Sequence, residues 1–324
     1  MGLFGGSSQK RQPAAKPKPT QRRPVAKPAP AGEGEKDEGP VWGCPSMTIL
    51  LKDAPSIDRK RLQATFQREF PGIECRIAGL FASQTDNAFA NDPEKQAAFQ
   101  AALGGDGGLS TETGFEARLG GQVITCLGMP FQAPGLEEML QTSRSDREAI
   151  AQVLPGHASH VLCMTKAGPE LGVETTANLF RLAVALEEQG AIGVIQVDAW
   201  QCFLVQRLRD HLTADAAEKL SGPYFPLVWC NAIPFHGEGG SWMTSKGFAV
   251  AGVPDIAIWV RSQPELAHAG ELLGNLFHYL HKGAKLKHGE TLQMEGCPNF
   301  RIGPVTEHHD FLCGRGETIA LTPV

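Results

Sequence analysis

Apolar residues recur at regular spacings from about residue 45 onward, and the spacing distinguishes strands from helices. Short apolar runs such as MTILLK at 47–52 predict strands, whereas leucine and phenylalanine at every third or fourth position predict helices, as at 59–70. The predicted strands of this part are 47–52, 73–82, 115–119, 122–131, 159–165 and 191–197. The predicted helices are 59–70, 92–103, 136–140, one that starts near 145, 174–189 and 199–212.

Capping residues support several of these boundaries. Asp58 is suited to cap the helix at 59–70, and Gly190 is suited to end the helix at 174–189. Ser145-Asp146-Arg147-Glu148 has the pattern of a capping box, which predicts Ser145 as an N-cap. The helix at 174–189 is predicted to be amphipathic, with inward positions Leu179, Leu182, Ala183 and Leu186.

The last hundred residues predict a second group of elements. Strands are expected at 227–235 and 257–260, followed by the longest helix at 265–282, with Pro264 in its first turn and Gly283 after its end. The apolar stripe of this helix is Leu266, Ala269, Leu273, Leu276, Phe277 and Leu280. Its opposite face, which we expect to meet solvent or a partner, is His268, Glu271, Asn275 and His278. Short strands with glycine turns are predicted from there to Val324.

These patterns indicate an α+β fold with mixed sheets and helices packed on one side, in two subdomains. We divide the chain into a tail at 1–44, an N-terminal α+β subdomain at 45–221 and a C-terminal α+β subdomain at 222–324. The second boundary is placed at a cluster of glycine and proline, Gly222-Pro223 and Pro226.

The tail differs in composition from the rest of the chain. Residues 10–30 read KRQPAAKPKPTQRRPVAKPAP, with Val25 as the single aliphatic residue besides alanine, and an acidic block follows at 33–38. Such a segment cannot bury enough apolar surface to offset its ordering entropy, so we expect it to be disordered. We interpret it as a solvated spacer in preference to an arm for nucleic acid or an anionic surface, although its basic residues would suit such an arm.

Charge and cysteine usage narrow the class of protein. The net charge of −5 argues against a nucleic-acid binder with a broad basic face. The eight cysteines are scattered, without a CxxC pair, and several lie in apolar runs, which predicts buried free thiols in a reducing compartment. We find neither an export signal nor a run of about 18 apolar residues, so we expect a cytoplasmic protein without a membrane span.

Histidine pairs are the first candidates for chemistry. His157 and His160 precede a strand, where an imidazole could act as a general base or could simply bind backbone groups. His278 and His281 share a helix, but no third metal ligand lies within one turn of them on it. The sequence also lacks a nucleophile elbow and a phosphate loop, and the glycine-rich stretches at 104–108 and 237–240 are expected to be flexible loops. We therefore assign no catalytic, cofactor-binding or metal residue and expect no cofactor.

One polar and aromatic segment suits a binding surface. The stretch CNAIPFHGEGGSWMTSKG at 230–247 contains Asn231, His236, Trp242 and Lys246. A loop with these residues beside a strand either contacts a partner or covers the core, with Trp242 as its plug. The two interpretations have equal weight at this point.

The C-terminal region also resembles a known family. The runs SKGFAVAGVPDIAIWV at 245–260 and LLGNLFHYLHKGAKLKHGETL at 272–292 are similar to the bacterial domain of unknown function 4261 family. GGQVITCLGMPFQAPGLEEML at 120–140, followed by GHASHVLCM at 156–164, extends the resemblance over most of 47–324. The resemblance implies a bacterial cytoplasmic protein and transfers no functional residue, because the family has no established activity.

Two classes of function follow from these observations. The first is a non-enzymatic binding or protein-interaction module, which the lack of recognisable catalytic motifs favours. The alternative is an enzyme with a dispersed active site that involves His157, His160 or the loop with Trp242.

Overall fold

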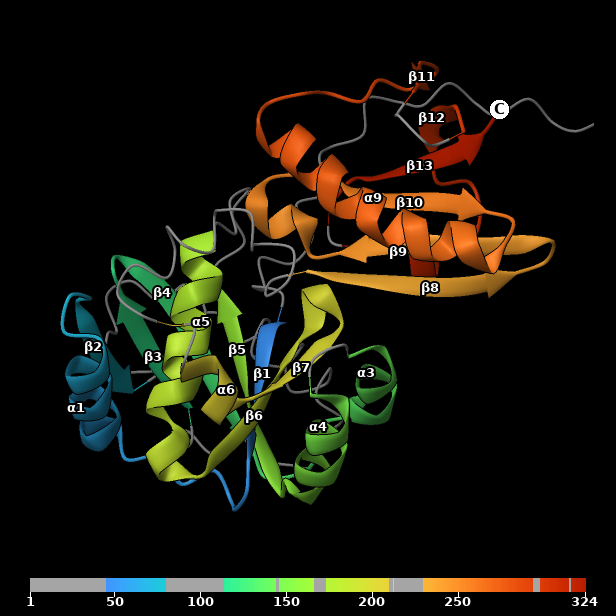
Figure 1. Ribbon diagram of the computed structural model, residues 1–324. Coiled ribbons are helices and arrows are strands. Elements are labelled where there is room, and N and C mark those ends of the chain that lie inside the picture. Colours follow the sequence, from blue (N-terminus) through green and yellow to red (C-terminus); the bar gives the residue numbers. More distant parts are fainter. Residues whose placement is uncertain are drawn as a thin grey trace, which may run out of the picture. The chain divides into compact units, whose positions relative to one another are not determined.

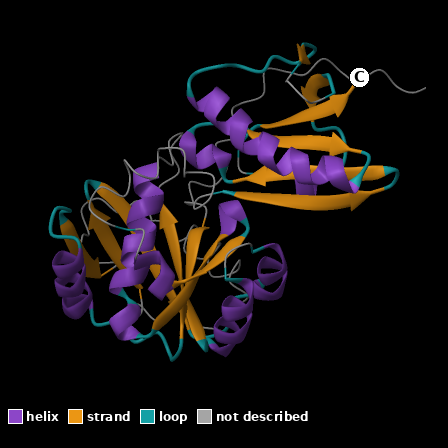
Figure 2. Cartoon of the chain, in the orientation of Figure 1, coloured by secondary structure: helices purple, strands orange, loops and turns teal. Residues whose placement is uncertain are grey.

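The computed structural model describes residues 45–79, 114–143, 146–165, 173–209, 212, 230–293, 298–314 and 316–324. These residues form two β-sheets with helices packed against them (Figures 1 and 2). Both sheets belong to one compact unit, Val41–Val324. The architecture is α+β, as the hydrophobic pattern predicts. None of the described helices is long and apolar enough to cross a membrane.

The first sheet has the strand order β2-β3-β4-β5-β1-β6-β7, and every neighbouring pair in it is antiparallel. Its strands are β1 (Pro45–Leu51), β2 (Cys75–Gly79), β3 (Gly114–Leu119), β4 (Gln122–Met129), β5 (Ser159–Thr165), β6 (Ala191–Gln196) and β7 (Gln201–Leu204). Because β1 lies between β5 and β6, those two strands run parallel to each other. The helix between them in the chain therefore makes a β-α-β crossover over an inserted strand.

Helices cover both faces of this sheet. Alternate residues of β1 show the two faces, since Ile49 belongs to one core cluster and Leu50 to another. Helices on the Ile49 face are α1 (Arg59–Glu69), α5 (Val173–Ala185) and α6 (Val205–Arg209). On the Leu50 face lie α3 (Leu136–Thr142) and α4 (Arg147–Val153). Three 3₁₀ turns complete this part, η1 (Leu154–Gly156), η2 (Glu187–Gln189) and η3 (Val197–Ala199). The prediction that helices pack on one side is therefore wrong for this sheet, which has helices on both faces.

Helix α1 begins as its sequence predicts. The Asp58 side chain accepts hydrogen bonds from the backbone N–H groups of Lys60 and Arg61, which satisfies two donors of the first turn. Leu62 and Phe66 are fully buried, one turn apart on the same face.

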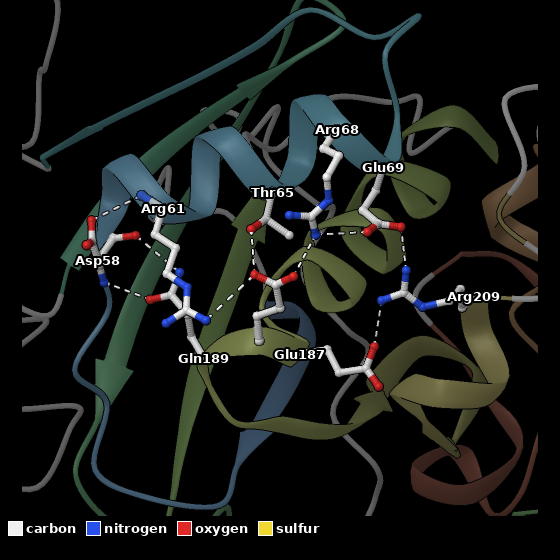
Figure 3. A network of polar contacts seen from close by, with 9 residues as sticks. Asp58, Arg61, Thr65, Arg68, Glu69, Glu187, Gln189 and Arg209 are labelled. Carbon is white, nitrogen blue, oxygen red and sulfur yellow. Dashed lines mark hydrogen bonds and ion pairs between the residues drawn. The ribbon is translucent and has the colours of Figure 1, made fainter.

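A polar network ties α1 to η2 and α6 (Figure 3). Glu188 accepts from Arg68 at 2.6 Å and from Thr65 at 3.1 Å, and its carboxylate lies 3.7 Å from Arg61. Hydrogen bonding from Arg68 lowers the pKa of Glu188. The remaining contacts of the network join Arg68 to Glu69, Arg209 to Glu69 and Glu187, and the Gln189 amide to the Asp58 backbone. Thr65 is buried, but the charged side chains of the network are partly exposed, so the network is a set of surface ion pairs that connects these elements.

Helix α5 is buried on all sides, so the prediction of an amphipathic helix is wrong. Every residue from Thr175 to Ala185 is buried, including Asn178 and Arg181. These polar residues bond each other in part, because Arg181 donates through Nη1 to Asn178 at 2.8 Å and to Glu174 at 2.6 Å, whereas its buried Nε has no partner among the described residues. Leucine spacing identified the most apolar face, and it could not show that other segments also cover the opposite one.

The second sheet has the order β11-β12-β13-β10-β9-β8 and is mixed, since β10 and β13 are parallel while the other pairs are antiparallel. Its strands are β8 (Asn231–Gly237), β9 (Gly240–Lys246), β10 (Asp255–Val260), β11 (Thr291–Leu292), β12 (Phe300–Pro304) and β13 (Thr318–Pro323). Its helical elements are η4 (Phe248–Ala251), α9 (Gln263–His281) and α10 (His309–Leu312).

Helix α9 packs along one face of this sheet (Figure 1). Ser262 caps it, and Gly283, in the left-handed region at φ 92°, follows its end. The predicted stripe is confirmed, because all six of its apolar residues are buried. His268, Glu271 and Asn275 are exposed as predicted, whereas His278 is half-buried against the ring of Phe277.

Three local predictions are corrected by the structure. Residues 201–204 form strand β7 where a helix at 199–212 was predicted, because Trp200 adopts a left-handed turn and the chain then pairs with β6. The N-cap of α4 is Asp146, which makes no side-chain capping bond, so no capping box forms there. The segment at 231–246 is a hairpin of β8 and β9 and not a loop. The predicted tail at 1–44, the helix at 92–103, the stretch at 104–108 and the boundary at 221–222 lie outside the described residues.

Candidate functional site

The face of the second sheet opposite α9 carries the residues best suited to a site. Residues paired across neighbouring strands point to the same face, and the register of β8, β9 and β10 therefore defines rows. One row consists of Phe235, Trp242 and Trp259, and a second of Ile233, Thr244 and Ala257. The third row pairs Asn231 with Lys246, and Asp255, two residues before Ala257, extends it.

The first row is the centre of an aromatic cluster. The cluster comprises Trp200, Phe235, Trp242, Trp259, His308 and Phe311. Phe311 from α10 lies 4.6 Å from Phe235 and 5.2 Å from Trp200, measured between ring centroids. Trp242 and Trp259 are 5.2 Å apart in an edge-to-face arrangement. Trp242 is buried at 5 % exposure, His308 is exposed, and the other four rings are half-buried. The cluster therefore extends from the buried core to the protein surface.

Backbone strain is concentrated in this cluster. Among the described residues, three other than glycine have positive φ, and two of them are Trp200 at 50° and His308 at 52°. The third is Asp146 at the start of α4. A left-handed backbone is unfavourable for a bulky side chain and persists only where surrounding contacts hold it. Such outliers occur preferentially at functional sites, so this placement supports a site at the cluster.

Lys246 lies beneath the cluster as a fully buried cation. Its Nζ donates to the carbonyl oxygen of Cys313 at 2.7 Å and lies 4.7 Å from the centroid of the Trp200 ring. Burial lowers the pKa of Lys246 to about 8. The ammonium thus holds Trp200 by a cation–π contact and links β9 to the end of α10.

Asp255 is the buried acid of the same row. Burial raises its pKa to about 6, although its carboxylate accepts from Ser245 Oγ at 2.7 Å and from the Phe248 backbone N–H at 3.2 Å. Gly314 passes so close that a Cβ there would lie 2.6 Å from Oδ2. Asp255 therefore fixes the turn between β9 and β10, and its surroundings leave no room for a larger residue at position 314.

Two buried polar atoms near the cluster lack a protein partner within the described part of the chain. Asn231 donates through Nδ2 to the carbonyl oxygens of Thr142 and Trp200 at 2.9 and 3.1 Å, but its Oδ1 accepts no hydrogen bond. The indole Nε1 of Trp242 likewise donates to no acceptor. An unsatisfied buried group costs about 1–3 kcal/mol, and in a native protein it calls for a specific explanation.

The two histidines proposed as general bases are held by backbone groups. His157 is buried. Its Nε2 accepts a hydrogen bond from the Ala133 N–H at 2.8 Å, and its Nδ1 lies 2.7 Å from the Leu154 carbonyl oxygen. This pattern requires a neutral ring with the proton on Nδ1. His160 bonds the Phe131 carbonyl oxygen through Nδ1 at 2.8 Å, and burial lowers its pKa. Both rings therefore connect the start of β5 to the segment after β4.

Apart from His308 of the aromatic cluster, the remaining described histidines do not gather into a site. His236 is exposed and bonds Ser241 Oγ at 2.8 Å across the hairpin. His281 stacks on Phe277 at the end of α9, and His278 contacts the edge of the same ring. Within the described ranges, no group of three or more histidine, cysteine or acidic side chains is arranged to hold a metal ion.

Sequence reasoning found part of this site. Of the four residues singled out together, Asn231, Trp242 and Lys246 do lie on one sheet face, whereas His236 points to the opposite face. It missed Trp200, His308 and Phe311, which come from distant parts of the chain and have no motif around them. Their common signal, a single aromatic ring in a short connecting segment or short helix, is too frequent in sequences to identify a site.

Comparisons with known proteins add no relative, because no family model, curated protein or solved structure matches this chain. The resemblance to the domain of unknown function 4261 family therefore rests on the quoted sequence runs alone and stays a prediction.

Proposed function

We propose that this protein is a non-enzymatic interaction module that uses the aromatic cluster to bind another protein. The observation that carries the proposal is a set of four half-buried rings and an exposed histidine on one face, two of them on a strained backbone. Aromatic side chains supply much of the energy at protein interfaces, where they cluster near the centre and are desolvated in the complex.

The cluster is rigid in a way that favours binding. Lys246 and Phe311 hold the Trp200 ring, and Asn231 and Thr142 hold its backbone carbonyl oxygen. Rings that are already fixed lose little conformational entropy when a partner covers them. The same rigidity offsets the cost of the left-handed backbone at Trp200.

The alternative, an enzyme built around His157, His160 or Trp242, has weaker support. Both ring nitrogens of His157 already bind backbone groups, so the ring has no free nitrogen for a substrate. Trp242 is a core residue of the cluster at 5 % exposure. We further propose a reducing, cytoplasmic location, because the six described cysteines are free thiols.

A site-specific photocrosslinker tests the proposal. Placed at Phe235 in the full-length protein, it should yield a crosslinked partner of defined mass in cells of the source organism, and Trp259→Ala in the same chain should reduce the yield at least several-fold. The matched control position is Tyr279, which is exposed at 53 % but belongs to α9 on the opposite side of the sheet. Circular dichroism would confirm that each variant is folded. The same adducts from both positions, or none from Phe235, would contradict the proposal.

A further inference from the structure

Two cysteines face each other in the middle of the first sheet. Cys126 of β4 and Cys163 of β5 are direct partners in the antiparallel ladder, and their sulfur atoms are 3.9 Å apart. Both side chains are fully buried on the face that packs against α1 and α5. Across the ranges that the structure describes, no other two cysteine sulfurs are in contact.

The backbone already has the spacing that a disulfide needs. Directly opposed residues of antiparallel strands have Cα atoms about 4.5–5.5 Å apart, and disulfides span Cα distances of about 4.4–6.8 Å. The sulfur atoms must still approach to about 2.05 Å, which rotation of the two side chains provides without separating the strands.

We propose that Cys126 and Cys163 form a disulfide when the chain folds in the presence of a low-molecular-weight disulfide such as oxidised glutathione. The thiolate of one cysteine attacks the glutathione disulfide and releases one glutathione thiolate, which leaves a mixed disulfide on the protein. The second cysteine, after losing its proton to solvent, attacks the protein sulfur and releases the second glutathione. The two protein thiols are oxidised, and one glutathione disulfide is reduced to two thiols.

Burial decides when this reaction occurs. In the folded protein neither sulfur meets solvent, and burial raises the pKa of Cys126, so burial disfavours the reactive thiolate there. The exchange therefore proceeds in the unfolded or opened chain. Once the sheet closes, the same burial protects the disulfide from reductants, and the redox state at the time of folding is retained.

The disulfide would constrain a defined part of the fold. It closes the segment between β4 and β5, which contains α3 and α4. A crosslink limits the freedom of this segment in the unfolded chain, so the oxidised form should melt at a higher temperature than the reduced form.

Peptide mapping of the full-length protein tests the proposal directly. Trypsin releases 119–144 and 148–166, which contain Cys126 and Cys163 respectively as their single cysteines. After refolding from denaturant in a glutathione redox mixture, these two peptides should be recovered linked, as the dominant disulfide, and the melting temperature should rise by several degrees. The folded, reduced protein in the same mixture should acquire the link at least tenfold more slowly.

A pair of variants serves as the control. Cys126→Ala should abolish both the link and the rise in melting temperature, whereas Cys202→Ala, at another buried thiol without a sulfur neighbour among the described residues, should retain them. The peptide map of the wild type tests the proposal even if a variant fails to fold. Refolded protein in which Cys126 and Cys163 stay reduced, or pair with other cysteines, would overturn the proposal, and so would equally fast oxidation of the folded protein.

Discussion

Replacing Lys246 with methionine should change how the stability of the protein depends on pH. The Lys246 ammonium is fully buried, and the Cys313 carbonyl, the Trp200 ring and the charge of the Asp255 carboxylate replace its hydration only in part. Burial lowers its pKa from an ordinary value of 10.5 to about 8. Methionine has a similar length and no charge, so the variant removes the titration while it keeps most of the packing.

The direction follows from proton linkage. Between about pH 8 and 10.5 the unfolded chain holds a proton on Lys246 that the folded chain has released, so stability rises with pH across this window. Below pH 8 both states are protonated and the group adds no slope. At about 1.4 kcal/mol per pKa unit, the free energy of unfolding of the wild type should rise by about 3 kcal/mol relative to that of the variant between pH 8 and 10.5.

Urea unfolding followed by circular dichroism at several pH values measures this difference. The comparison with Lys246→Met is needed because other groups titrate in the same range. Burial raises the pKa values of Cys75 and Cys202 to about 11, which makes stability fall with pH in both proteins alike. Profiles that run parallel within about 0.5 kcal/mol from pH 8 to 10.5 would refute the argument that Lys246 is a desolvated cation.

Three further predictions concern packing and surface charge. Leu276→Ala in α9 should destabilise the protein by about 2–5 kcal/mol in urea unfolding, and His278→Ala by less than about 0.5 kcal/mol. If His278 held a structural metal, the two losses would be similar and a chelator would lower the melting temperature. Gly240→Ala places a Cβ 2.5 Å from the tryptophan ring of β10 and should cost about 1–3 kcal/mol, whereas Gly303→Ala meets no atom within 4 Å and serves as its control. Glu188→Gln should lower the melting temperature at pH 7, and the difference should vanish in acid, where its carboxylate is protonated, and shrink in 1 M salt; a salt-independent loss would contradict a surface ion pair.

The sequence by itself determined the elements whose signals are local. The six-residue stripe of α9, the Asp58 cap of α1 and the hairpin around Gly120-Gly121 all appear where periodicity and turn chemistry predict them. Each depends on residues within a few positions of one another, and neighbouring side chains are enough to specify it. The α+β class follows from the same local patterns.

Tertiary structure decided the features that depend on distant segments. Residues 201–204 contain apolar positions that fit a helix, and they became strand β7 because pairing with β6 is available. In α5 the polar residue Asn178 is buried because the hairpin of β3 and β4 supplies partners for it, the Leu119 carbonyl oxygen and the Gln122 side chain. No local pattern contains that information.

The aromatic cluster shows the same division most clearly. The hairpin sequence indicated Trp242 and Lys246 as residues of interest, because both stand in one short polar and aromatic segment. Only the fold brings Trp200 and Phe311, separated from each other by more than a hundred residues of sequence, against that hairpin. Contacts of this kind are specified by the packing of whole sheets and helices, and burial of apolar surface stabilises them without requiring any particular spacing along the chain.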